Sequence, residues 1–247
     1  FSLCGWSDWY APVGASLGNA WRVGPDDNNW QGILINIDIM ARLTNYSGPG
    51  GWNDPCLLLS SCTGLKDSDC PGGRRVTELQ SRAQFSMWAV MAAPLLISGS
   101  VVHMSAADFE TYSNAQVIAV SQDAAGKAGL RVLGDSLARN GSNVWSRPLA
   151  DGSVALVFIN AGQHAVDLTC DVACLVAAGL PAQGQLVFRD LWAPWRGEQL
   201  VEGGKIVASA LAPQGGHWML RVRRVASLEA RAVAEDAGSG DAVVPPV

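Results

Sequence analysis

The sequence predicts an α/β domain followed by an all-β domain. Across residues 1–124, short apolar runs alternate with helical patterns, a rhythm that is typical of βαβ units and of a parallel sheet. From about Leu130 the pattern changes to short strands in which apolar and polar residues alternate, as in an antiparallel β-sandwich. We therefore expect the α/β domain over residues 1–126 and the β-sandwich over residues 127–225.

In the first domain, six segments carry the expected alternation of strand and helix. We expect strands at residues 1–4, 56–59 and 95–98, and helices at residues 32–43, 78–92 and 106–113. In parallel sheets of this kind, functional side chains lie where a strand gives way to the following loop. Trp21, Asp26, Asp54 and Cys56 lie at such places.

In the second domain we expect six short strands, at residues 143–147, 154–160, 165–168, 186–190, 205–210 and 216–222. Asp151-Gly152 predicts a hairpin between the first two, because the turn requires a positive φ that glycine adopts readily. The last stretch, residues 226–247, is rich in Ala, Gly and Val and has no aromatic residue. We expect this tail to be disordered.

Charge and composition argue against several classes of protein. The 247 residues carry a formal net charge of −5 without any run of Lys or Arg, which argues against a nucleic-acid partner. The longest apolar stretch, residues 88–97, is far shorter than the ~20 residues of a membrane span, so we expect no membrane insertion. The six cysteines form no Cys-x-x-Cys pair and lie far from the three histidines, so no zinc site is expected.

Three sequence blocks, in a fixed order, carry a resemblance to a known family. The first is Trp21-Arg22 followed by Asp26, the second is residues 48–55 (Gly-Pro-Gly-Gly-Trp-Asn-Asp-Pro), and the third is residues 85–96. Shorter matches lie at residues 2–6 and 117–123. Together they resemble the melibiase family of retaining α-galactosidases and α-N-acetylgalactosaminidases, over roughly residues 1–225.

The resemblance implies a fold. The catalytic domain of the family is a (β/α)8 (TIM) barrel, and residues 1–4 look like its fifth strand. We therefore expect a partial barrel, strands five to eight, followed by the antiparallel β-sandwich. The family's nucleophile is an Asp in a Lys-Tyr-Asp sequence at the end of the fourth strand, which this sequence does not contain. We expect the chain alone to be inactive, and to pair with a complementing N-terminal half or to form a homo-oligomer.

The resemblance also implies an activity. The complete enzyme would hydrolyse terminal α-D-galactosyl groups of an oligosaccharide or glycoconjugate with retention, without a metal or an organic cofactor. The competing hypothesis is a carbohydrate-binding or structural remnant that does not cleave the sugar. Within the enzyme class, α-N-acetylgalactosaminidase and β-L-arabinopyranosidase specificities stay open.

Asp26 is the candidate acid/base. A retaining glycosidase needs two carboxyl groups about 5 Å apart, one as nucleophile and one as acid and then base. Asp26 follows Arg22 by four residues, as in the family's Arg-x-x-x-Asp segment, and Arg22 is expected to bind and orient the substrate. Asp27 is the rival within the motif. The alternative is that Asp26 caps the helix that begins near Asn28.

Four further residues are candidates for contacting the sugar. Asp54 either supports the site or fixes its own backbone in an Asx turn before Pro55. Cys56 stands where the family usually has an Asp that reaches the sugar, and a thiol is a weaker hydrogen-bond acceptor than a carboxylate. Trp6 and Trp52 lie beside strand ends, where an indole stacks on a sugar, although large aromatics also fill cores.

Gly5 is a second departure from the family pattern. α-Galactosidases commonly have Glu at this position, next to the sugar's 2-position, and α-N-acetylgalactosaminidases have a small residue. Gly5 leaves space for a 2-acetamido group, or Trp9 and Tyr10 refill that space.

The cysteines suggest two disulfides. Cys62 and Cys70 flank a polar loop, and Cys170 and Cys174 resemble a small disulfide loop in the family's animal members. Cys4 and Cys56 are then unpaired or joined to the complementing half. With two N-glycosylation acceptors, Asn45-Tyr46-Ser47 and Asn140-Gly141-Ser142, this favours a secreted or lumenal protein.

Overall fold

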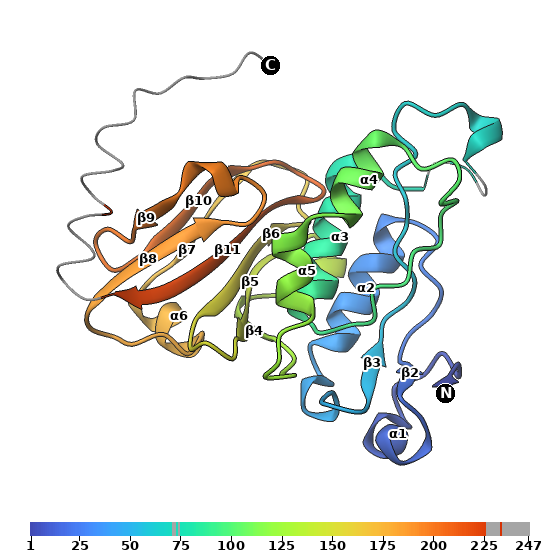
Figure 1. Cartoon of the computed structure of the whole chain (residues 1–247), viewed down its shortest axis with the longest axis horizontal. Helices are drawn as coiled ribbons and strands as arrows, with labels where there is room; N and C mark the ends of the chain where they lie inside the picture. The colour runs from blue at the N-terminus through green and yellow to red at the C-terminus, as the bar shows by residue number, and fades with distance from the viewer. Residues whose placement is uncertain (71–72, 74, 226–232, 234–247) are drawn as a thin grey trace.

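The computed structural model describes residues 1–70, 73, 75–225 and 233 (Figure 1). It contains an α/β part and a β part. The predicted tail, residues 226–247, lies outside the described residues except for Val233.

The α/β part is built on a short parallel sheet. Its strands, in spatial order, are β1 (Ser2–Leu3), β2 (Ala20–Arg22) and β3 (Trp52–Asp54). The predicted strands at residues 56–59 and 95–98 are reduced to one parallel bridge, between Leu58 and Ile97. The sequence pattern missed β2 and β3, because three residues are too few to display the period of a strand.

Five helices accompany this sheet in the described residues: α1 (Ala11–Leu17), α2 (Trp30–Met40), α3 (Glu78–Val90), α4 (Ala106–Tyr112) and α5 (Ala115–Ser121). The predicted helices at residues 32–43, 78–92 and 106–113 correspond to α2, α3 and α4. Thr77 and Gln80 form a capping box at the start of α3. The side chain of Asn29 caps α2 by accepting from the N–H of Gly32 at 3.0 Å.

The β part is an antiparallel sandwich. Its larger sheet has the spatial order β4-β5-β6-β11-β8-β9, and β10 pairs with β7 in a second sheet. The strands are β4 (Leu130–Gly134), β5 (Ser142–Pro148), β6 (Val154–Asn160), β7 (Val166–Cys170), β8 (Gln185–Asp190), β9 (Glu198–Leu200), β10 (Ile206–Leu211) and β11 (Gly216–Val225), with helix α6 (Val172–Ala177) after β7. All six predicted strands are confirmed. Gly152 has φ +82°, as the predicted hairpin requires.

Helix α3 joins the two parts. Figure 1 shows α3 and α5 lying between the larger sheet and α2. Phe85 and Trp88 of α3 are buried in one hydrophobic cluster with Trp145, Val157 and Met219 of the sheet. The opposite face of the sheet packs against the β10-β7 pair in a second cluster. The α/β part is therefore held by the sandwich through a continuous core.

Both predicted disulfides are confirmed. Cys62 pairs with Cys70 and Cys170 with Cys174. Cys4 is unpaired and exposed, and Cys56 is unpaired and buried. In the part of the chain that the structure describes, no helix is both long and apolar enough to cross a membrane.

Candidate active site

A pocket of about 280 Å³ opens beyond the carboxyl ends of β2 and β3. Arg22 ends β2 and Cys56 follows β3 by two residues, so both strands deliver side chains to the same place. The segment between β2 and α2 adds Asp26, Asp27 and Asn28 to the lining. The remaining lining residues are Leu57, Leu59, Ser60, Cys62, Leu65, Asp69, Gly73, Arg75, Ser98, Gly99, Ser100, His103, Met104 and Asp108.

Arg22 lies at the centre of this site. Its Nη2 donates to Asp26 Oδ1 at 2.8 Å and contacts Cys56 Sγ at 2.6 Å, while its Nε is buried without a hydrogen-bond partner among the described residues. Burial lowers the pKa of Arg22. The neighbouring Cys56, Asp54 and Asp26 together raise it by more, so the net shift is upward. The guanidinium is therefore a permanent positive charge at the floor of the pocket.

Asp26 lines the pocket, with 55% of its side chain exposed. The alternative role of helix cap is taken by Asn29 instead. Asp26 thus combines an ion pair to a buried arginine with access from solvent, an arrangement suited to exchanging protons with a bound molecule.

Asp27 differs from Asp26 in its burial and in its hydrogen-bond partners. It is 3% exposed, and its oxygens accept from Asn36 Nδ2 on α2 and, at 3.1 Å, from Gln84 Nε2 on α3. Burial raises the pKa of Asp27 to about 7, against the lowering effect of the Asn36 hydrogen bond and of Arg22. Since both oxygens are held by the protein, Asp27 ties the pocket segment to two helices.

Cys56 connects Arg22 with the backbone of Asp27. Its Sγ lies 3.3 Å from the N–H of Asp27, and its carbonyl accepts from Trp88 Nε1 at 2.9 Å. Burial and, secondarily, the charge of Asp27 raise the pKa of the Cys56 thiol. The neighbour of Arg22 is therefore a neutral thiol, at the position where the resemblance predicts a carboxylate. Cys56 has a φ of 153°, a backbone conformation that residues other than glycine rarely adopt.

Asp54 is buried behind the pocket and is not part of its lining. Burial raises its pKa, whereas Arg22 and a hydrogen bond from the backbone of Cys56 lower it. The hydrogen bond from a residue two positions later is the Asx-turn pattern that the sequence left open. Asp54 therefore lies where it supports Arg22 and the chain at Cys56.

The structure does not bring Trp6 or Trp52 to the pocket. Trp6 is 61% exposed on the loop after β1. Trp52 pairs with Ala20 at the amino ends of the strands, whereas Arg22 pairs with Asp54 at the carboxyl ends. For Trp52, the sequence pattern did not distinguish the amino end of the strand from the carboxyl end.

Tyr10 fills the space beside Gly5. A Cβ at Gly5 would lie 2.6 Å from Cε1 of Tyr10, so no larger residue fits there without displacing the ring. The Tyr10 hydroxyl accepts from the N–H of Gly5 at 2.9 Å and donates to the carbonyl oxygen of Arg22. The structure therefore favours the alternative in which an aromatic side chain, that of Tyr10, occupies the space left by Gly5.

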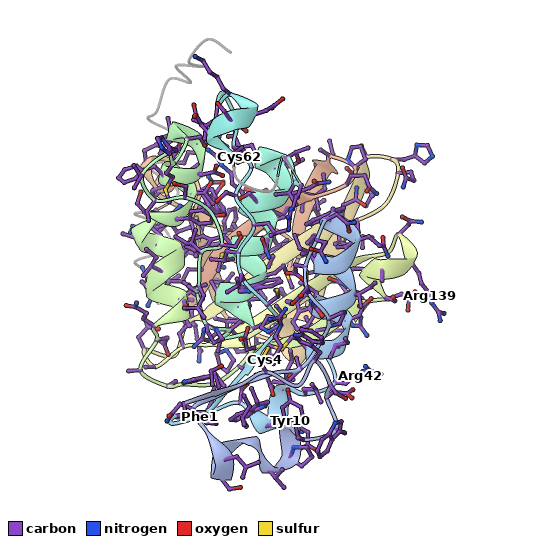
Figure 2. All side chains as sticks on the ribbon, turned by 90° about the vertical axis from the view of Figure 1, so that its right-hand side faces the viewer. Phe1, Cys4, Tyr10, Arg42, Cys62 and Arg139 are labelled. Atoms are coloured by element: carbon purple, nitrogen blue, oxygen red, sulfur yellow. A yellow bond between two sulfur atoms is a disulfide. The ribbon has the colours of Figure 1, made fainter. Side chains whose placement is uncertain are left out.

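Sequence reasoning missed the outer wall of the pocket. This wall is made by the disulfide loop Cys62–Cys70 and by the segment that contains Ser100, His103 and Met104. Figure 2 shows Cys62 at the end of the α/β part opposite Phe1 and Tyr10. The two cysteines signalled a closed loop in the sequence, but not which cavity it borders. Among the described residues, no group of three His, Cys, Asp or Glu side chains is arranged to hold a metal ion.

Known proteins match both parts of the chain. A family model described as α-galactosidase A matches residues 10–123, and a model of the α-galactosidase C-terminal β-sandwich domain matches residues 139–222. An α-galactosidase of Oryza sativa subsp. japonica is 35% identical over 78% of this chain and 42% of its own length. α-Galactosidase A of Homo sapiens is 31% identical over 69% of this chain and 40% of its own length.

A solved structure shares the fold. α-Galactosidase I from Mortierella vinacea superimposes with a TM-score of 0.75 at 21% identity, covering 92% of this chain and 58% of that chain. The chain thus spans less than half the length of the curated relatives named above. Two family models in succession, with relatives above 30% identity, show that the chain belongs to the melibiase-type α-galactosidase family of glycoside hydrolases.

Proposed function

We propose that this chain supplies the acid/base side of a retaining α-galactosidase active site. The observation that carries the proposal is the pair formed by Arg22 and Asp26, 2.8 Å apart, in which the arginine is buried and the carboxyl group borders the pocket. The rival carboxyl group, Asp27, has both oxygens occupied by protein amides.

In this proposal Asp26 first donates a proton to the departing glycosidic oxygen and then accepts one from the attacking water. Arg22 keeps Asp26 in place through this ion pair and adds a fixed positive charge at the floor of the pocket. Cys56 Sγ contacts the same nitrogen of the guanidinium, Arg22 Nη2, at 2.6 Å. The nucleophilic carboxylate comes from residues outside this sequence, so we expect the chain by itself to leave an aryl α-galactoside intact.

We further propose that β1, β2, β3 and the bridge from Leu58 to Ile97 correspond to strands five to eight of a (β/α)8 barrel, within a domain of residues 1–126 that precedes the sandwich of residues 127–225. Parallel strands with an open edge associate readily with another chain. The partner we propose is a complementing segment with strands one to four, and a homo-oligomer is the alternative when that segment is missing.

The proposed substrates are oligosaccharides or glycoconjugates that end in an α-D-galactosyl group. The relatives from Oryza sativa and Homo sapiens are α-galactosidases. Tyr10 occupies the space beside Gly5, which supports a 2-hydroxyl over a 2-acetamido group. Two disulfides support a secreted or lumenal location, since disulfides persist in oxidising compartments.

The test is turnover of an aryl α-galactoside by the chain combined with a segment that supplies strands one to four. We expect hydrolysis with the combination and none with the chain alone. In the combination, Asp26→Asn should lower kcat by about 10²- to 10⁴-fold, the range of general acid-base catalysis. Binding of galactose by the combination without any turnover would reject the hydrolase and favour a binding protein.

A further inference from the structure

A group of side chains outside the pocket lining joins helix α3 to the sandwich. At its centre is Trp192, in the loop that follows β8. The indole N–H of Trp192 donates to the hydroxyl of Ser86 on α3 at 2.9 Å. The same indole meets the imidazole of His217 on β11 edge to face, with 6.0 Å between the ring centroids. One indole therefore contacts both the helix and the sheet, and a titratable imidazole lies beside it.

On the helix side, the charge next to Trp192 is positive. The guanidinium of Arg82 on α3 lies over the Trp192 ring, 5.4 Å from its centroid, in a cation–π contact. Arg82 also pairs with Glu78 at 3.2 Å and with Glu110 of α4 at 3.1 Å. Within the described residues, neither glutamate forms an ion pair with His217. The carboxylates on this side therefore compensate the arginine and not the imidazole.

On the sheet side, the nearby carboxylate is bound to other groups. Asp190 ends β8, and its charge acts on His217. Its Oδ1 accepts from the backbone N–H of Trp192 at 2.8 Å, and its Oδ2 accepts from the indole N–H of Trp218 at 2.9 Å. Nδ1 of His217 lies 3.1 Å from the carbonyl oxygen of Gly215, a contact that a neutral imidazole satisfies by donating its one N–H. The surroundings therefore accept the neutral ring without needing its charge.

The balance of these effects disfavours the protonated imidazole. Burial is the largest cause and lowers the pKa of His217 to about 4, from an ordinary value of 6.5. Arg82 lowers it as well, whereas the hydrogen bond to Gly215 and the charge of Asp190 act in the opposite direction. Between these two values an imidazole released from the junction takes up a proton that the closed junction does not bind. The free energy that keeps the junction closed therefore falls as the pH drops from about 6.5 to about 4, and is level below that.

We propose that His217, Trp192 and Arg82 form an acid-sensitive contact between α3 and the sandwich, which holds while the imidazole is neutral and weakens when it takes up a proton. The added positive charge is repelled by Arg82, and the nearby carboxylates are already bound to other partners. Gln84 and Trp88 of the same helix hold the loop after β3, so a weaker contact also reaches the pocket from outside it. The proposal rests on the junction alone and not on the proposed hydrolysis.

Hydrogen exchange of the Trp192 indole N–H in the native full chain measures the opening of this contact. After correction for the intrinsic exchange rate at each pH, we expect the protection of this N–H to fall by about 10²-fold between pH 7 and pH 4. This is the factor that corresponds to the lowered pKa of His217. In His217→Phe, which keeps an aromatic ring but cannot take up a proton, the protection should stay level over the same range.

The matched control is His164→Gln, which removes an exposed histidine of the β part and should leave the fall in protection as it is in the unaltered chain. If His217→Phe does not fold, His217→Gln takes its place, because glutamine is also uncharged and can donate to the carbonyl of Gly215. Asp27 is present in all of these chains, so its own pH dependence does not enter the comparison between them.

Three results would overturn the proposal. The first is protection of the Trp192 indole that stays level down to pH 4 in the unaltered chain. The second is a fall of the same size in the His217 variant. The third is a fall that disappears in His164→Gln. None of these outcomes depends on turnover, so the proposal fails or stands separately from the acid/base assignment of Asp26.

Discussion

The neighbouring carboxyl groups of Asp26 and Asp27 lie in different surroundings, which suit them to different roles. Asp26 pairs with Arg22 and is half exposed, whereas Asp27 is buried between Asn36 and Gln84. The sequence spacing selected Asp26 but could not exclude Asp27, since the two are adjacent. The hydrogen-bond partners that distinguish Asp27 from Asp26 come from α2 and α3, and no local sequence pattern predicts such contacts.

The buried carboxyl group predicts a pH dependence of stability. Burial raises the pKa of Asp27 to about 7 in the folded chain, from an ordinary value of 3.8. Between these values the folded chain keeps a proton that the unfolded chain has lost, so the contribution of Asp27 to the free energy of unfolding falls as pH rises from about 4 to about 7. The total loss is up to about 4 kcal/mol.

Urea unfolding of the chain at pH 5, 6, 7 and 8 measures this slope. Asp27→Asn should remove the slope that Asp27 contributes, whereas Asp26→Asn leaves the buried carboxyl group in place and serves as the control. An unchanged slope in Asp27→Asn would show that another group causes it.

The two unpaired cysteines should react at very different rates. Cys4 is exposed, whereas Cys56 is buried beside Arg22 with a pKa raised by burial, so little of its reactive thiolate forms. With a thiol-specific reagent and no reductant, we expect one fast equivalent from the native chain and a second only after unfolding, since four of the six cysteines are in disulfides. A fast second equivalent, or more than two after unfolding, would contradict this description.

At the scale of elements, the sequence predicted long helices and alternating strands well and short pieces badly. Helices α2 and α3 and the six predicted strands of the β part show their periods over enough residues to be predicted, and the seven-residue α4 was predicted as well. The strands β2 and β3, with three residues each, and the helices α1, α5 and α6, with seven or fewer, were not predicted. Those short pieces carry Arg22 and Asp54, which explains why motifs were needed to find the site.

Helix α3 holds the loop after β3 through Gln84, in addition to the hydrogen bond from Trp88 to the carbonyl of Cys56. Gln84 is fully buried; its Nε2 donates to Asp27 and to the carbonyl of Leu57, and its Oε1 accepts from the N–H of Leu59 at 2.8 Å. Gln84→Ala leaves these three buried groups unpaired, so we expect a loss of about 2–4 kcal/mol in the free energy of unfolding.

Chemical denaturation measures the effect of Gln84→Ala. The control on the same helix is Leu79→Ala, whose side chain is 38% exposed and should cost far less. Equal losses in the two variants would mean that the Gln84 hydrogen bonds do not hold this segment.

At the scale of the molecule, the two parts share one core, which the sequence did not reveal. The change of pattern near Leu130 predicted two domains, but α3 packs its buried face directly against the larger sheet. Arg147 of β5 is fully buried, and its Nη1 donates to the carbonyl of Ala89 at 2.6 Å across this junction. Burial lowers the pKa of Arg147 to about 10, so it stays charged at neutral pH. Such long-range contacts leave no local signal.

The shared core predicts one cooperative unfolding transition. Trp145 is fully buried at the junction, so Trp145→Ala should cost about 3–5 kcal/mol and destabilise both parts together. The control, Trp195→Ala, removes an indole that is 78% exposed and should change little. NMR signals from Trp21 in the α/β part and Trp218 in the sandwich should disappear at the same denaturant concentration, and two separate midpoints would contradict the shared core.

The most direct measurement is the dependence of hydrolysis on the leaving group, in the chain combined with strands one to four. A proton donor matters most when the departing oxygen is a poor leaving group, so Asp26→Asn should slow cleavage of a galactosyl disaccharide far more than first-turnover release of dinitrophenol, by about 10²-fold or more. Asp27→Asn should slow both substrates alike. If Asp27→Asn instead shows the dependence on leaving group and Asp26→Asn does not, the assignment of the acid to Asp26 is wrong.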